Sequence, residues 1–120
     1  MGLYGFQKWF VPFILSGEKT HTIRAIRANP DKPGNTLHLY TGLRRKGARL
    51  LMRVPCVKVE GIVITPGGMI RIADQWLEDD EREALARRDG FEDFASMIRF
   101  WREPKDRLPF HGHIIHWRQR

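Results

Sequence analysis

The chain has 120 residues, of which 42% are hydrophobic, so it holds enough apolar material for one core and too little for two. A single domain over residues 1–120 is therefore expected. The sequence carries 21 Lys and Arg against 14 Asp and Glu, a formal net charge of +7, which favours nucleic acid over cations or acidic surfaces as a partner. The charge alone equally fits a soluble basic protein with no such partner.

Residue usage argues against a disulfide-stabilised protein and against a membrane-spanning one. The single cysteine, Cys56, cannot form an internal disulfide, and its apolar neighbours predict a packed thiol in the reducing cytoplasm. No apolar stretch approaches the length of a membrane span, and the early apolar run is interrupted by polar residues and by Pro12. The sequence therefore predicts a cytoplasmic protein without a membrane segment.

The first forty residues alternate extended and helical signals. Residues 3–10 are rich in aromatic side chains and predict a strand or an extended arm, with these rings in the core rather than free for base stacking. Residues 12–16 predict a short helix, with a proline in its first turn and a glycine after its end. Strands are predicted over residues 19–26 and 36–40, joined by a stiff, proline-containing turn over residues 29–34.

The segment of residues 17–24 has a density of functional groups that packing alone rarely requires. In a continuous strand, side chains alternate between the two faces of the sheet. One face would then carry Thr20, Thr22 and Arg24. The other face would carry Lys19, His21 and Ile23. Among these residues, the candidate substrate-binding groups are Thr20, His21 and Arg24.

The candidate catalytic groups are Lys19, Thr22 and Asp89. A lysine in a partly apolar cleft beside a second cation loses proton affinity, and it can then take the proton of a threonine hydroxyl or hold an attacking oxygen. A nearby carboxylate can pass a proton to a leaving amine. Two structural interpretations stay open: a plain Lys19–Asp89 ion pair, and a helix-ending Asp-Gly turn that uses the Asp89 side chain.

A basic loop bounded by glycines follows the predicted strand of residues 36–40. Its cations, together with those at the start of the next strand, are candidate contacts for nucleic-acid phosphates, namely Arg44, Arg45, Lys46, Arg49 and Arg53. The alternative is a solvated turn without a ligand.

The second half of the chain predicts strands first and then helices. The apolar series along the long strand changes phase near residues 55–56, which predicts a bulge or bend, and shorter strands follow over residues 61–65 and 69–72. From Trp76 an acidic start and a basic end predict a helix that stops at Gly90. A second helix begins at an Asp93 cap, is stopped by Pro104, and carries an apolar stripe assigned to the core. Residues 108–117 predict a closing strand.

No cofactor and no metal are predicted. His111 and His113 are spaced like strand-borne metal ligands, but no second ligand cluster accompanies them. The sequence also has no glycine-rich phosphate loop and no nucleophile-elbow motif.

The pattern Gly-x-Lys-x-x-Thr-x-Arg after a short apolar helix resembles the signature of the ASCH domain family. Further likeness comes from a Pro-Gly strand start at residues 33–39, an Asp-Gly-Phe helix junction at residues 86–91 and an apolar closing strand at residues 112–117. The resemblance covers about residues 6–117 and implies an α+β fold: a small PUA-like β-barrel with two or three short helices.

The resemblance also implies a function. Some small ASCH proteins are amidohydrolases that remove the acetyl group of 4-acetylcytidine with a lysine, a threonine and a glutamate. Lys19 and Thr22 match the first two, whereas Asp89 stands where the family has glutamate, with Glu92 as an alternative acid. An RNA or a modified nucleoside is the expected partner. Whether the chain is such an enzyme, a non-catalytic RNA-binding module or a ribonuclease stays open, as does its state as a monomer or a weak dimer.

Overall fold

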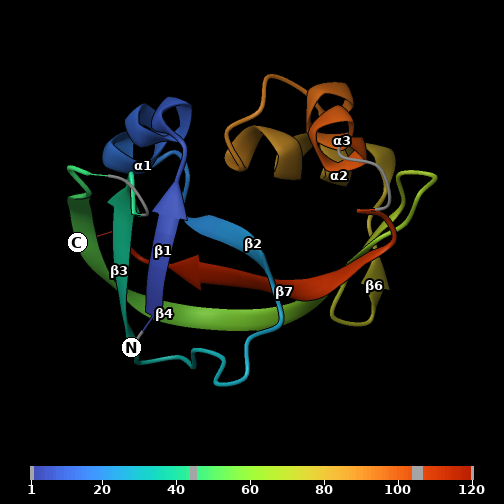
Figure 1. Cartoon of the computed structure of the whole chain (residues 1–120). Helices are drawn as coiled ribbons and strands as arrows, with labels where there is room; N and C mark the ends of the chain where they lie inside the picture. The colour runs from blue at the N-terminus through green and yellow to red at the C-terminus, as the bar shows by residue number, and fades with distance from the viewer. Residues whose placement is uncertain (1, 44–45, 104–106, 120) are drawn as a thin grey trace.

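The computed structural model describes residues 2–43, 46–103 and 107–119, and it shows an α+β fold in which the helices lie on one side of a curved, mixed sheet (Figure 1). In chain order the elements are β1 (Gly2–Phe6), the 3-10 helix η1 (Lys8–Phe10), α1 (Val11–Ser16), β2 (His21–Ala25), β3 (Thr36–Thr41), β4 (Arg49–Ile64), β5 (Ile70–Ile72), β6 (Gln75–Trp76), α2 (Asp79–Arg88), α3 (Phe94–Arg102) and β7 (Phe110–Trp117).

The sheet has seven strands and is not closed. β1 runs parallel to β3, whereas the pairs β3–β4, β4–β5, β5–β6, β4–β7 and β2–β7 are antiparallel. Within the described ranges β1, β2 and β6 each have one neighbour, so the α+β class is confirmed and the predicted barrel is not.

β4 is the strand that joins the two parts of the sheet. Its first half pairs with β3 and its second half with β7, and the register shifts between Cys56 and Lys58. This shift lies where the apolar pattern changes phase, which confirms the predicted irregularity near residues 55–56. Cys56 itself is buried and free, and burial raises the pKa of its thiol, in agreement with a packed side chain.

The first helix ends as predicted, but the next strand begins later than predicted. Gly17 adopts a left-handed conformation with φ 87°, and its N–H bonds the carbonyl of Ile14 at 3.2 Å. The Lys19 N–H then donates to the Phe13 carbonyl at 2.9 Å, so α1 fixes Lys19 before β2 starts at His21. The predicted strand start at residue 19 is therefore two residues too early, because Lys19 and Thr20 precede the strand.

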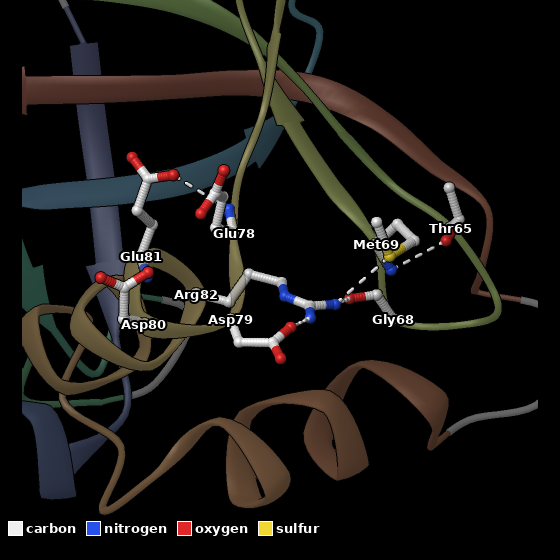
Figure 2. Close-up of polar contacts among 8 residues, drawn as sticks. All are labelled: Thr65, Gly68, Met69, Glu78, Asp79, Asp80, Glu81 and Arg82. Carbon is white, nitrogen blue, oxygen red and sulfur yellow. Dashed lines mark hydrogen bonds and ion pairs between the residues drawn. The ribbon is translucent and has the colours of Figure 1, made fainter.

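The start of α2 corrects a second prediction. Trp76 belongs to β6, and the helix begins only at Asp79, where the backbone leaves the extended conformation of Glu78. Figure 2 shows the Glu78 N–H donating to the Glu81 carboxylate at 2.9 Å. It also shows the Arg82 guanidinium donating to the Gly68 carbonyl at 2.9 Å and pairing with Asp79, which ties the helix to the turn between β4 and β5.

The end of α2 is a Schellman turn. Gly90, with φ 102°, donates its N–H to Arg87 at 3.1 Å, and the Phe91 N–H donates to Ala86 at 3.0 Å. The predicted stop at Gly90 is confirmed. Because backbone groups supply both hydrogen bonds, the Asp89 side chain is not used by the turn.

α3 packs its apolar stripe into the core, as predicted. The Asp93 side chain accepts the Ser96 N–H at 2.8 Å and caps the helix. The stripe residues Met97, Ile98 and Trp101 are buried. Pro104, the predicted stop, lies outside the described residues, and no helix within them is long and apolar enough to cross a membrane.

Replacing Trp101 by alanine tests this packing. Trp101 is 7% exposed, so its deletion should lower the free energy of unfolding by about 3 to 5 kcal/mol, as core aromatic deletions do. Trp76 is 50% exposed and provides a matched control, for which we expect a change within about 0.5 kcal/mol. Urea denaturation measures both, and a Trp101→Ala protein as stable as Trp76→Ala would contradict the packing of α3 on the sheet.

Candidate active site

A pocket of about 340 Å³ lies among the ends of β1, η1, β2, α2 and α3. Its polar lining brings together residues that are far apart in the sequence: Gln7, Lys19, Thr22, Arg24, Asp89 and Arg107. Its apolar wall is mainly aromatic, with Phe6, Phe10, Phe91, Phe100 and Trp101 beside Ile23. The three candidate catalytic residues therefore share one pocket.

Lys19 and Asp89 form a buried ion pair in this pocket. Lys19 is 2% exposed and Asp89 5% exposed, and the Lys19 Nζ donates to Asp89 Oδ1 at 2.5 Å. The same amine donates to the Asp89 backbone carbonyl at 2.8 Å and lies 4.7 Å from the centre of the Phe10 ring. Lys19 thus places a cation at the C-terminus of α2, where the helix dipole favours one.

His21 lies behind the carboxylate rather than in the pocket. Its Nε2 is 2.9 Å from the same Asp89 Oδ1 that accepts the Lys19 amine, but this contact does not meet the geometry of a hydrogen bond. His21 is 2% exposed and is not among the residues that line the pocket. A residue predicted to bind substrate therefore contacts a catalytic candidate instead.

Burial and the contacts among Lys19, His21 and Asp89 together shift the pKa values in this cluster. Burial lowers the pKa of Lys19, and the Asp89 carboxylate offsets only part of the effect. Burial by itself would raise the pKa of Asp89, but the Lys19 charge and the His21 contact hold it below its usual range. Burial also lowers the pKa of His21, despite the carboxylate. The movement of a single proton from Lys19 to Asp89 would remove both charges of the pair.

Thr22 and Arg24 share a face of β2, as predicted. The Arg24 Nε donates to Thr22 Oγ1 at 2.9 Å, and its second nitrogen donates to the Gly5 carbonyl at 2.7 Å. Burial and the neighbouring Arg27 lower the pKa of Arg24 to about 10, so it remains a cation at neutral pH. Since Thr22 Oγ1 accepts this hydrogen bond, its own hydroxyl proton is available for donation.

Sequence reasoning missed the far wall of the pocket. Arg107 lies over the rings of Phe100 and Trp101, with its guanidinium 5.2 Å and 5.3 Å from their centres. Phe91 contacts Phe100 with ring centres 5.4 Å apart. Of these residues, Phe91 is the one that the sequence could have placed near the site, because it directly follows the Asp-Gly pair of the Schellman turn.

The remaining candidates lie outside the pocket. Thr20 is half-buried, and its carbonyl accepts the N–H of Trp117 at 2.9 Å. Glu92, the alternative acid, is exposed and does not line the pocket. The basic-loop candidates that the structure describes are exposed, namely Lys46, Arg49 and Arg53. Arg44 and Arg45 lie outside the described residues.

The histidine pair of the closing strand contributes to a second, smaller pocket. His111 and His113 line a cavity of about 210 Å³ together with Arg71. Within the part of the chain that the structure describes, no group of three or more His, Cys, Asp or Glu side chains is arranged to hold a metal ion.

Comparison of the chain with protein families, with characterised proteins and with solved structures gave no match. Any assignment of function therefore depends on the pocket itself.

Removing one member of the Lys19–Asp89 pair should be costly. Lys19→Met leaves a buried carboxylate without its cation, and we expect a loss of about 3 to 5 kcal/mol in the free energy of unfolding. The double variant Lys19→Met with Asp89→Leu removes both charges and should be more stable than Lys19→Met alone. Lys58→Met is the control, because Lys58 pairs with Glu60 at 3.4 Å on the surface and should contribute at most about 1 kcal/mol. Equal losses in Lys19→Met and Lys58→Met would contradict a buried pair.

The stability of the protein should fall in mild acid. Burial lowers the pKa of both His21 and His116, whereas a histidine of the unfolded chain titrates near pH 6.5. As the pH falls through about 6.5, the unfolded chain binds protons that the native state does not, so the free energy of unfolding decreases. Urea denaturation at about pH 7.5 and about pH 5.5 measures this loss. His21→Gln and His116→Gln should each reduce the loss, whereas substitution of the exposed His111 by glutamine should not. Identical losses in all of these proteins would show that His21 and His116 do not cause the loss of stability in acid.

Proposed function

We propose that this pocket binds an N-acylated cytidine-type nucleoside and hydrolyses its exocyclic amide. The observation that carries the proposal is the meeting of Lys19, Thr22 and Asp89 in one pocket with an aromatic wall. The pocket volume of about 340 Å³ suits a small molecule, since such sites range from about 300 to about 1,000 Å³.

The lining of the pocket suits a planar, polar ligand. The aromatic side chains provide flat surfaces on which a pyrimidine can stack. Arg24 and Arg107 supply hydrogen-bond donors for carbonyl and hydroxyl oxygens of the nucleoside. The burial of the polar groups limits the access of water to them, which strengthens their electrostatic interactions with the ligand.

The proposed reaction begins with attack of Thr22 Oγ1 on the amide carbon. Lys19, in its neutral form, takes the hydroxyl proton as the C–O bond forms. The proton then passes from Lys19 to Asp89 across their 2.5 Å contact, and Asp89 gives it to the amine nitrogen as the C–N bond breaks, so that cytidine leaves and the acyl group remains on Thr22 as an ester. Attack of water on this ester releases the carboxylic acid and restores the hydroxyl.

The surroundings of each group support its proposed role. Burial favours the neutral form of Lys19 that a base requires. The Arg24 cation donates to Thr22 Oγ1 at 2.9 Å and stabilises negative charge that develops on this oxygen. The Lys19–Asp89 contact of 2.5 Å provides a direct route for a proton between the two groups.

We also propose kinship with the ASCH family and its PUA-like architecture, on the Gly-x-Lys-x-x-Thr-x-Arg motif. Asp89 in place of the family glutamate is compatible with this kinship, since the short contact with Lys19 needs no longer side chain. A cytoplasmic location belongs to the same proposal, because the buried Cys56 thiol is unpaired.

A pocket that binds a nucleobase of RNA without turnover is the second candidate. The observation in its favour is that Lys19 and Asp89 are satisfied by each other, as in a purely structural pair. Exposed cations on β4, Arg49 and Arg53, are available for RNA phosphates in this case.

Substitution of Thr22 tests the enzyme directly. Thr22→Val keeps the branched shape and removes the hydroxyl, so release of cytidine from 4-acetylcytidine should fall below detection, whereas Thr22→Ser should retain activity. Thr20→Val is the matched control, because this threonine lies two residues away and outside the pocket, and its activity should equal that of the wild type. Chromatography of the products measures all four proteins.

Two results would overturn the proposal. If Thr22→Val releases cytidine as fast as Thr20→Val, the hydroxyl is not the nucleophile. If the wild type releases nothing from a panel of acylated cytidines and yet binds single-stranded RNA, the second candidate replaces the enzyme.

A further inference from the structure

The Asp89 carboxylate is held by one of its two oxygens. Both the Lys19 Nζ at 2.5 Å and the His21 Nε2 at 2.9 Å approach Oδ1. Among the residues that the structure describes, no donor bonds Oδ2. Because Asp89 lines the pocket, Oδ2 is the oxygen that remains for a bound ligand.

We propose that His21 is a positioning residue that fixes the rotation of the Asp89 carboxylate and so presents Oδ2 to the substrate amine. This inference rests on the proposed function, in which Asp89 supplies the proton to that amine. His21 touches neither the pocket nor the ligand and acts only through Asp89.

The neighbours of His21 determine its protonation. Three positively charged or titratable groups surround it: Lys19 before β2, Arg88 at the end of α2, and His116 directly opposite on β7, with the two imidazole rings 5.9 Å apart. His116 in turn contacts Glu60 of β4 at 3.4 Å. Among the residues that the structure describes, the carboxylate of Asp89 is the anion in contact with His21, and Lys19 already balances it. These charges and burial favour a neutral imidazole.

A neutral imidazole carries one N–H, and the contact with Asp89 selects the nitrogen that holds it. A lone pair on Nε2 would repel the lone pairs of Oδ1 at 2.9 Å, so the proton lies on Nε2. The contact does not have the geometry of a hydrogen bond, so it acts as a charge–dipole attraction between the N–H and the carboxylate. With Lys19 on the same oxygen, the two contacts oppose rotation of the carboxylate.

Two variants separate the effect of the His21 N–H from the effect of the space that its imidazole ring fills. His21→Gln carries an amide N–H at about the distance of Nε2, so it can still donate to Oδ1. His21→Met fills similar space without a donor. His116→Gln is the control, because it changes the neighbouring imidazole and leaves the His21 contact intact.

The first measurement needs no substrate. Carbon-13 NMR of the Asp89 carboxyl group follows its titration, and we expect the midpoint to rise by about one pH unit in His21→Met, because the ionised carboxylate loses its contact with the His21 N–H. The midpoint in His21→Gln and in His116→Gln should match the wild type. If His21→Met does not fold, His21→Asn replaces it, since its shorter amide cannot reach Oδ1.

The second measurement is the rate of cytidine release. His21→Met should lower kcat by up to about 100-fold with little change in KM, because binding groups are kept and the acid is misplaced, and His21→Gln should recover most of this loss. An Asp89 midpoint that is the same in the wild type and in the donor-free variant would overturn the inference. A wild type that releases no cytidine would overturn the proposed function instead, while the NMR titration would still decide the role of His21.

Discussion

The buried contact between Lys19 and Asp89 is the interaction on which the pocket depends. It joins the segment after α1 to the end of α2, two parts of the chain that are 70 residues apart. It also supplies the cation that the last carbonyl of α2 requires. A pair of this kind costs desolvation energy that hydrophobic packing would not cost, so its burial is weak evidence for a purely stabilising role.

The polar groups of the site are arranged in two layers. Lys19, Thr22, Arg24 and Asp89 line the cavity, and His21 contacts the carboxylate without lining it. The rings of the aromatic wall belong both to the core and to the cavity. These rings are therefore largely buried and yet available to a ligand. The apolar pattern of the sequence does not distinguish rings of this kind from ordinary core residues.

Local signals in the sequence predicted most of the elements. The ends at Gly17 and Gly90, the cap at Asp93 and the irregularity near residue 55 each depend on a few neighbouring residues. The two-residue strand β6 and the open sheet were not predictable in this way, because they depend on pairing between distant strands. The start of β2 was predicted two residues too early, because the end of α1 fixes the backbone of Lys19 outside the strand.

The attachment of Arg82 to Gly68 has a consequence for the site at the other end of α2. The helix has 10 residues, a length of about 15 Å, and it is anchored to the β4–β5 turn at its start and to Lys19 at its end. Asp89 is therefore located by two attachments rather than one. A substitution that displaces the turn at residues 65–69 would therefore also displace Asp89, although this turn does not line the pocket.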